Sequence, residues 1–152
     1  KDIQISLLDT LNIILSYYLN GYMLNNKSQK IYFGWQANKQ LLHCFEKVDP
    51  NDILGISRIN QALLKHKFSR LFLFDLISEC ENIWSEYSEF PQDIFTIIDD
   101  LQNIAIKFSV YLSRKRINAK FIADTIQALK LLHEKEQYYM EKIWTITQTI
   151  AR

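Results

Sequence analysis

Apolar residues recur at three- and four-residue steps along almost the whole chain of 152 residues. That spacing puts them on one face of an α-helix, whereas a half-buried strand requires strict alternation. The chain also holds only three Gly and two Pro, and folds rich in tight turns need many more of both. We therefore expect an all-α fold, an antiparallel bundle of five or six helices, several of them longer than about 20 residues.

Breaks in the apolar spacing predict where each helix begins and ends. Asp49 and Asn118 are the expected N-cap residues, and Pro91 suits a first helical turn. No strand pattern of useful length is found, and residues 70–77, although apolar, lack flanking turn residues. Two separate helices are expected over residues 49–66 and 69–89, and one continuous helix there is the alternative. The expected helices cover residues 3–24, 28–48, 49–66, 69–89, 91–116 and 118–152.

The composition predicts one folded domain over residues 1–152. Hydrophobic residues make up 48% and aromatic residues 13% of the chain, which is enough for a core and unlike a disordered chain. Cys44 and Cys80 have no zinc-binding spacing, so we expect two buried free thiols in a reducing compartment, the cytoplasm. The N-terminal apolar stretch carries Asp9, Asn12 and Ser16 at helical intervals. We therefore expect it to be amphipathic and not to span a membrane.

Charge is segregated along the chain, although the net charge is only +1. Residues 56–70 hold four bases and no acid, residues 71–106 hold eight acids and no base, and residues 107–135 hold seven bases against two acids. If residues 69–89 and 91–116 form an antiparallel pair of helices, the acids gather at their turn and the bases at the far ends. The pattern predicts an acidic pole and a basic pole on the order of 30 Å apart.

The acidic pole mixes carboxylates with aromatic residues. Aromatic side chains are enriched in binding hot spots, and surrounding acids would steer a basic partner. Glu86 and Glu89 are expected at the C-terminal end of a helix, where carboxylates oppose the helix dipole, so stability does not explain them. Trp84 fits the inner, core-facing stripe. The candidate partner-binding residues are Glu79, Glu86, Tyr87, Glu89, Phe90 and Asp93.

The basic pole offers an alternative, a grip on nucleic-acid phosphates. Phe68 and Phe121 would then stack on bases if they are exposed. The simpler interpretation is a solvated helix end whose bases complement the dipole, and the nearly neutral net charge favours it. The candidate nucleic-acid-binding residues are Lys65, Lys67, Arg70, Arg114, Lys115, Arg116 and Lys120.

Sequence motifs for catalysis, for metal ligation and for cofactor binding are not found. His43, His66 and His133 belong to no zinc-binding motif, and three Gly leave little material for a phosphate-binding loop. Arg58 and His66 resemble the Arg–His element of HEPN-type ribonucleases, which are also helical bundles. Here the gap is seven residues, and a helix would turn the two side chains about 80° apart. We expect no enzyme, no cofactor and no metal.

Together these features favour a non-enzymatic helical protein-binding module. Its most concrete form is an inhibitor or immunity protein whose acidic pole binds a basic, nuclease-type toxin, because such toxins carry basic clefts for nucleic acid. The alternative is a small nucleic-acid-binding subunit that uses residues 65–70 and 114–120. An enzyme with an unrecognised site and a structural piece of a larger protein also stay open.

Overall fold

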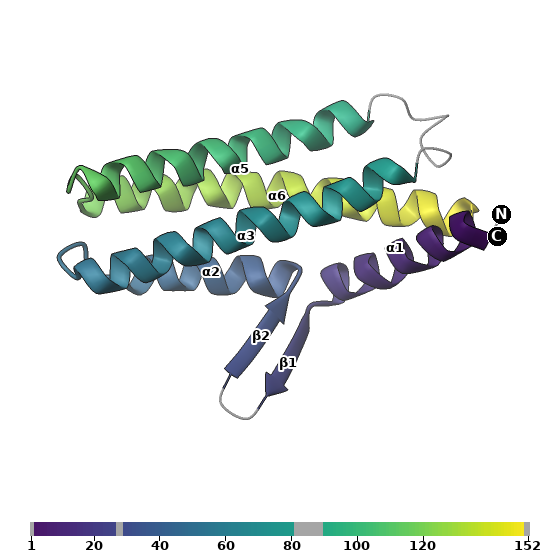
Figure 1. Ribbon diagram of the computed structural model, residues 1–152, viewed down its shortest axis with the longest axis horizontal. Helices are drawn as coiled ribbons and strands as arrows, with labels where there is room; N and C mark the ends of the chain where they lie inside the picture. The colour runs from purple at the N-terminus through teal and green to yellow at the C-terminus, as the bar shows by residue number, and fades with distance from the viewer. Residues whose placement is uncertain (1, 27–28, 81–89, 151–152) are drawn as a thin grey trace.

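The computed structural model describes residues 2–26, 29–80 and 90–150 (Figure 1). Over these residues the chain forms five helices that pack together and one short β-hairpin, so it is mostly helical, as the sequence predicts. Three of the helices have 27, 24 and 32 residues. The elements are α1 (Asp2–Asn20), β1 (Tyr22–Asn26), β2 (Gln29–Phe33), α2 (Trp35–Lys47), α3 (Ile53–Glu79), α5 (Phe90–Ser113) and α6 (Ala119–Ile150).

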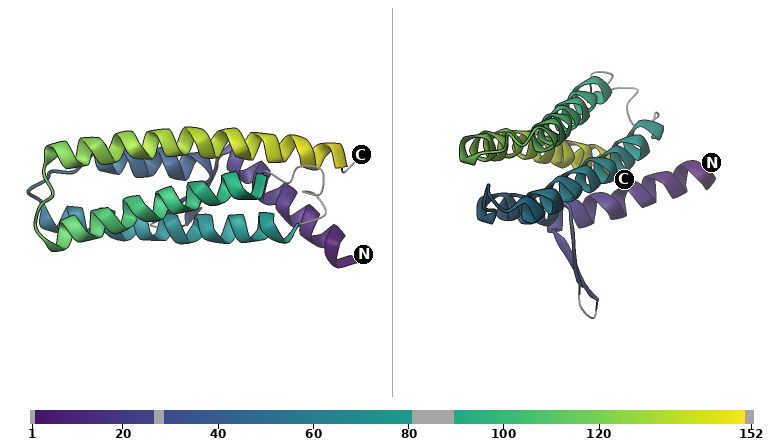
Figure 2. Two further views of the ribbon diagram at one scale, coloured as in Figure 1. Left: turned by 90° about the horizontal axis from the view of Figure 1, so that it is seen from above. Right: turned by 60° about the vertical axis from the view of Figure 1, so that its left-hand side comes forward.

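The helices form two layers, seen most clearly from above (Figure 2). The pair α3 and α5 makes one layer, and α6 and α2 lie behind it. α1 runs obliquely, from the level of α6 at its C-terminal end toward the level of α3 at its N-terminal end. Lys130 Nζ of α6 lies 3.8 Å from Glu46 Oε1 of α2. Further along α6, Gln148 Nε2 donates to Asn12 Oδ1 of α1 at 3.5 Å. The long α6 therefore runs past both α2 and α1, which follow one another along it.

The apolar core lies between these layers, and every helix contributes to it. Leu15, Phe45, Phe74, Phe108 and Met140, one from each helix, are at most 1% exposed. Phe45 and Phe108 meet edge to face with ring centroids 5.5 Å apart. Each such side chain stabilises the fold by about 1.5–3 kcal/mol relative to an exposed position. The apolar residues spaced three and four apart in the sequence thus lie on the helix faces that pack together in the core.

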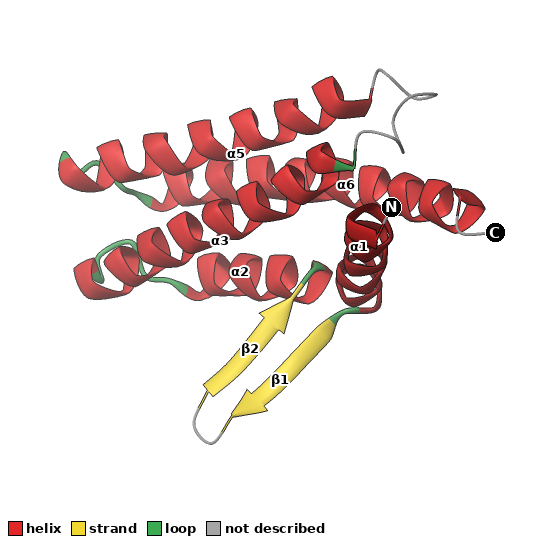
Figure 3. Ribbon diagram, turned by 45° about the vertical axis from the view of Figure 1, so that its right-hand side comes forward, coloured by secondary structure: helices red, strands yellow, loops and turns green. Residues whose placement is uncertain are grey.

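The β-hairpin corrects the helices expected at 3–24 and 28–48. β1 and β2 pair antiparallel, with Leu24 opposite Ile31, and extend away from the helices (Figure 3). Gly21 and Gly34 bracket the hairpin with φ of 71° and 62°, a left-handed backbone that glycine adopts without a Cβ penalty. A Cβ on Gly34 would also overlap the backbone of Tyr18. These two glycines therefore end α1 and begin α2, with the hairpin between them.

Other helix ends agree with the sequence in part. Asn118 is confirmed as a cap, because its Oδ1 accepts the Phe121 N–H at 2.8 Å. The expected cap at Asp49 is wrong: Asp52 Oδ1 accepts the Gly55 N–H at 3.1 Å and starts α3. α3 then continues without a break through residues 66–69 and ends at Glu79 rather than at residue 89.

Both cysteines are free thiols, but only Cys80 is buried. The expectation that Cys44 is buried is wrong, because its side chain on α2 is exposed. Over the described part of the chain, no helix combines the length and the apolar character that crossing a membrane requires.

Candidate functional site

A buried polar cluster lies where α1 and α2 meet, facing α3 and α6. Its ion pair joins Arg70 of α3 to Glu136 of α6, with Arg70 Nε 3.0 Å from each carboxylate oxygen. None of its side chains is more than 8% exposed. The six members of this ion-pair cluster are Tyr18, Asn38, His66, Arg70, His133 and Glu136.

Hydrogen bonds satisfy both charges of the ion pair. Arg70 Nη2 donates to Asn38 Oδ1 at 2.6 Å and to the Gly34 carbonyl at 3.2 Å. Glu136 Oε1 accepts from the Tyr18 hydroxyl at 2.6 Å and from Asn38 Nδ2 at 3.1 Å. Burial and the Glu136 charge hold the pKa of Tyr18 well above its ordinary value, so its hydroxyl stays a donor. The ion pair therefore fixes four helices and the end of the hairpin against one another.

The position of Arg70 corrects one sequence prediction. Arg70 was expected among the nucleic-acid-binding residues, but its side chain is 7% exposed and is paired with Glu136. A guanidinium in that position cannot reach a phosphate. Glu136 itself attracted no attention in the sequence, although it follows His133 by three residues and so shares its helix face.

The two buried histidines of the ion-pair cluster face each other from α3 and α6. The ring centroids of His66 and His133 lie 5.3 Å apart. His66 Nε2 and both ring nitrogens of His133 are buried without a hydrogen-bond partner. Burial lowers the pKa of His133, the Glu136 charge partly opposes this and the Arg70 charge adds to it, so the pKa lies at about 4. Burial, and then the Arg70 charge, lower the pKa of His66 well below its ordinary 6.5. Both rings are therefore neutral near pH 7.

The cluster fits a structural role better than a catalytic one. Its side chains are enclosed, so a substrate has no access to the neutral imidazoles. Within the described ranges, no group of three or more His, Cys, Asp or Glu side chains could hold a metal ion. Arg58 is exposed while His66 is buried, so the two do not form the pair that the HEPN resemblance requires.

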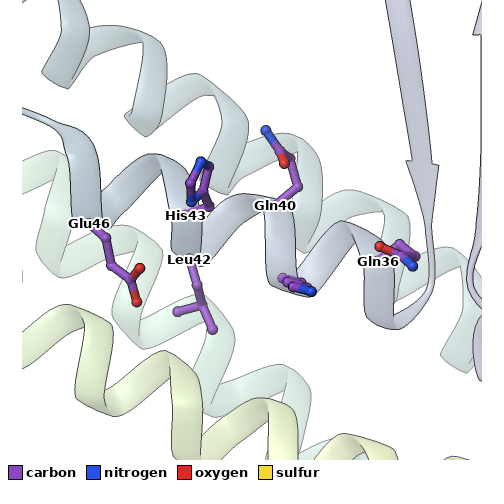
Figure 4. A pocket seen from close by; sticks show the side chains of 6 residues that line it. Gln36, Gln40, Leu42, His43 and Glu46 are labelled. Carbon is purple, nitrogen blue, oxygen red and sulfur yellow. The ribbon is translucent and has the colours of Figure 1, made fainter.

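A surface hollow of about 480 Å³ lies along the outer side of α2 (Figure 4). Its described lining comes entirely from this one helix, so no second element closes over it. A ligand there would stay largely in solvent, whereas small-molecule sites bury most of their ligand. The hollow is therefore a weak candidate. Its described lining residues are Gln36, Lys39, Gln40, Leu42, His43 and Glu46.

The outer face of α3 is the strongest surface candidate. Phe68 and Phe72 lie one turn apart near the middle of this helix and are 61% and 84% exposed. Exposed residues follow one another at alternating steps of four and three residues, which is one straight face of a helix. We name this face the α3 stripe. It consists of Leu54, Arg58, Gln61, Lys65, Phe68, Phe72, Asp75 and Glu79.

Most residues predicted for the acidic pole cannot be placed. Glu86, Tyr87, Glu89 and the core candidate Trp84 lie outside the described residues. Phe90 and Asp93 belong to the first turn of α5 by their backbone, and their side chains are likewise outside the description. Glu79 is exposed in the last turn of α3 and belongs to the α3 stripe. Asp75, one turn earlier, was not among the predicted residues, although its helical spacing from Glu79 was visible in the sequence.

The predicted basic pole does not form one surface. Ser109 Oγ donates to Asn60 Oδ1 at 2.9 Å and so sets the register of α3 against the antiparallel α5. In that register Lys65 lies opposite residue 104, which leaves Arg114 about 15 Å further along the helix axes. Phe121 is buried and stacks on Tyr111 with ring centroids 4.2 Å apart.

The bases at the turn between α5 and α6 do stay together in solvent. Arg114, Lys115, Arg116 and Lys120 are all exposed there. Lys65 and the half-buried Lys67 lie on α3, well apart from them. We name the four bases at the turn the basic turn.

Comparison with protein-family models, with curated proteins and with solved structures finds no match to this chain.

Replacing Glu136 by glutamine should lower the free energy of unfolding by about 3–5 kcal/mol, because Arg70 would keep a buried charge with no counter-charge. Chemical denaturation followed by circular dichroism measures the change. The matched control is Glu134→Gln on the same helix, where the side chain is exposed and the change should stay below about 0.5 kcal/mol. A loss below about 1 kcal/mol for Glu136→Gln would contradict the central role of the ion pair.

Stability should fall as the pH drops from 6.5 toward 4. In that window the unfolded chain binds protons at His66 and His133 that the folded chain does not, because burial lowers both folded-state pKa values. The difference in His133 protonation between the unfolded and the folded chain should by itself lower the free energy of unfolding by roughly 2 kcal/mol between about pH 6.5 and 5. Denaturation midpoints measured across this range should show a shallower slope for His66→Leu/His133→Leu than for the natural chain. His43→Leu, at an exposed histidine, is the control and should keep the original slope.

Proposed function

We propose that this chain is a non-enzymatic helical protein-binding module and that the α3 stripe is its contact surface. The observation that carries the proposal is the exposure of Phe72 and Phe68, at 84% and 61%. Two adjacent phenylalanines left in water in the middle of a long helix gain nothing for the isolated fold. Exposed apolar groups framed by charged residues are typical of surfaces that another protein covers.

The acids of the α3 stripe support the same proposal. Asp75 and Glu79 stand in the last two turns of α3, where a carboxylate faces the negative end of the helix dipole. The sequence predicts the same unfavourable arrangement at Glu86 and Glu89, which lie outside the described residues. At this end of the α3 stripe, a partner with basic groups beside an apolar surface would match Asp75 and Glu79.

The most concrete form of this function is an inhibitor or immunity protein that binds a basic, nuclease-type protein. Asp75 and Glu79 would face the basic cleft while Phe68 and Phe72 pack at its rim. This form extends the expectation drawn from the sequence, with the contact surface moved from the acidic pole to the α3 stripe.

A second candidate function is nucleic-acid binding through the basic turn. Its support is the exposure of all four bases around one short loop, where Lys115 takes a positive φ of 54°. Such a cluster can contact a few phosphates at once. Lys65 and Lys67 lie too far along α3 to join it, and Arg70 is buried, so the site is smaller than the sequence suggests.

Replacing both stripe phenylalanines, Phe68→Ser/Phe72→Ser, should weaken binding to a protein partner at least about tenfold and leave the fold intact, because both rings are exposed. Partners isolated with the natural chain, including any basic nuclease, are titrated against purified variants by calorimetry. Ile106→Ser, at a half-exposed residue of α5, is the matched control and should bind normally. Equal affinity of all three proteins for every partner would remove the α3 stripe as the contact surface.

The nucleic-acid function predicts a gel shift at low salt that weakens steeply as salt rises. Arg114→Glu/Arg116→Glu should abolish the shift, because both guanidinium groups are exposed in the basic turn. Lys39→Glu/Lys47→Glu makes the same change of net charge on α2 and should retain it. If neither single- nor double-stranded nucleic acid is shifted by the natural chain, this second candidate is excluded.

A further inference from the structure

The α3 stripe carries opposite charges on the two sides of its phenylalanine pair. Arg58 and Lys65 precede Phe68 and Phe72 along α3, and Asp75 and Glu79 follow them. Figure 1 shows α3 on the outside of the molecule, with no other element drawn in front of it. A partner that covers the whole stripe must therefore present acids at one end, apolar groups in the middle and bases at the other end.

We propose that the occupant of the α3 stripe is a second copy of this chain, bound with its α3 antiparallel to the first. This inference rests on the proposed function, because it names the partner of the same surface. A two-fold axis that passes at the level of residue 70 brings opposite charges together. Each residue of one copy then faces the residue of the other copy that lies the same number of positions beyond residue 70. Phe68 of one copy faces Phe72 of the other, and Lys65 faces Asp75.

The same arithmetic continues to the end of the described stripe. Glu79 of one copy faces Gln61 of the other and lies between the levels of Arg58 and Lys65. Each opposite-charge contact occurs twice in a symmetric dimer. A parallel arrangement would instead place every charge beside its own kind, which is destabilising. The order of residues along the stripe therefore selects the antiparallel orientation.

The shape of the surface also suits a neighbouring helix. The alternating steps of four and three residues are the spacing of a coiled-coil seam, in which each side chain of one helix packs between side chains of the other. Beside the phenylalanines, Leu64, Leu71 and Leu76 are half-buried and pack on the core. On the flank of the stripe opposite Leu64 and Leu71, the small Ala62 and Ser69 are exposed.

A partner that carries only basic groups has charge complementary to one end of the α3 stripe and not to the other. It would match Asp75 and Glu79 but would bring like charge to Arg58 and Lys65. A second copy matches both ends, so the charge pattern favours it.

Sedimentation velocity on the full chain, from micromolar to sub-millimolar concentration, tests the dimer. We expect a species of twice the 18.1 kDa chain mass that dissociates on dilution. Lys65→Glu alone and Asp75→Lys alone should each weaken the dimer at least about tenfold, because each variant brings like charges together twice. Mixing the two variants should restore it, since both contacts then join opposite charges.

Lys120→Glu, at an exposed base of the basic turn, is the charge-matched control and should dimerise as the natural chain does. A chain that stays monomeric at all concentrations overturns the inference. So does a dimer that Lys65→Glu leaves unchanged, or a mixture of the two charge variants that stays monomeric.

The outcomes also separate this inference from the proposed function. A monomeric chain that binds a different protein and loses it with Phe68→Ser/Phe72→Ser keeps the α3 stripe as a contact surface but rejects the second copy. A monomeric chain whose partners are unaffected by that double variant rejects both.

Discussion

The ion pair between Arg70 and Glu136 is the interaction on which the remaining architecture depends. It joins the two helix layers, and through the Gly34 carbonyl and Asn38 it also fixes the junction between the hairpin and α2. Taking two charges out of water costs several kcal/mol each unless both are fully paired. The geometry around the pair is therefore tightly constrained, and the packing of α1, α2, α3 and α6 must bring every partner to its place.

Helices with local signals were predictable from the sequence, and the hairpin was not. The Asn118 cap and the apolar faces of α5 and α6 are encoded by neighbouring residues. In the hairpin, apolar residues such as Leu24 and Ile31 fit a helical face as well as a strand, so their spacing does not decide between them. Gly21 and Gly34 were the overlooked local signal. The close approach of Gly34 to the backbone of Tyr18 is a tertiary contact, so the sequence alone does not show that the predicted helices at 3–24 and 28–48 are interrupted here.

The candidate site was predicted less well, because exposure is a property of the whole fold. Arg70 and Lys65 look alike in the sequence, yet one is buried on Glu136 and the other lies in solvent. The difference depends on a residue 66 positions away from Arg70. The joint exposure of Phe68 and Phe72 was likewise not predictable from the sequence, because the rotation of α3 about its axis decides which aromatic side chains face the solvent. That rotation places Phe74 at 0% exposure and Phe72 at 84%.

The long sequence separation within the ion-pair cluster also matters while the protein is being made. Tyr18 and Glu136 are 118 residues apart, so a ribosome completes α1, α2 and α3 well before the carboxylate exists. Until α6 has been synthesised, Arg70 has no counter-charge, and the surfaces that α6 covers in the folded protein are exposed to solvent. The N-terminal helices therefore cannot settle early into their final packing. We therefore expect stable packing of α1, α2 and α3 to require α6.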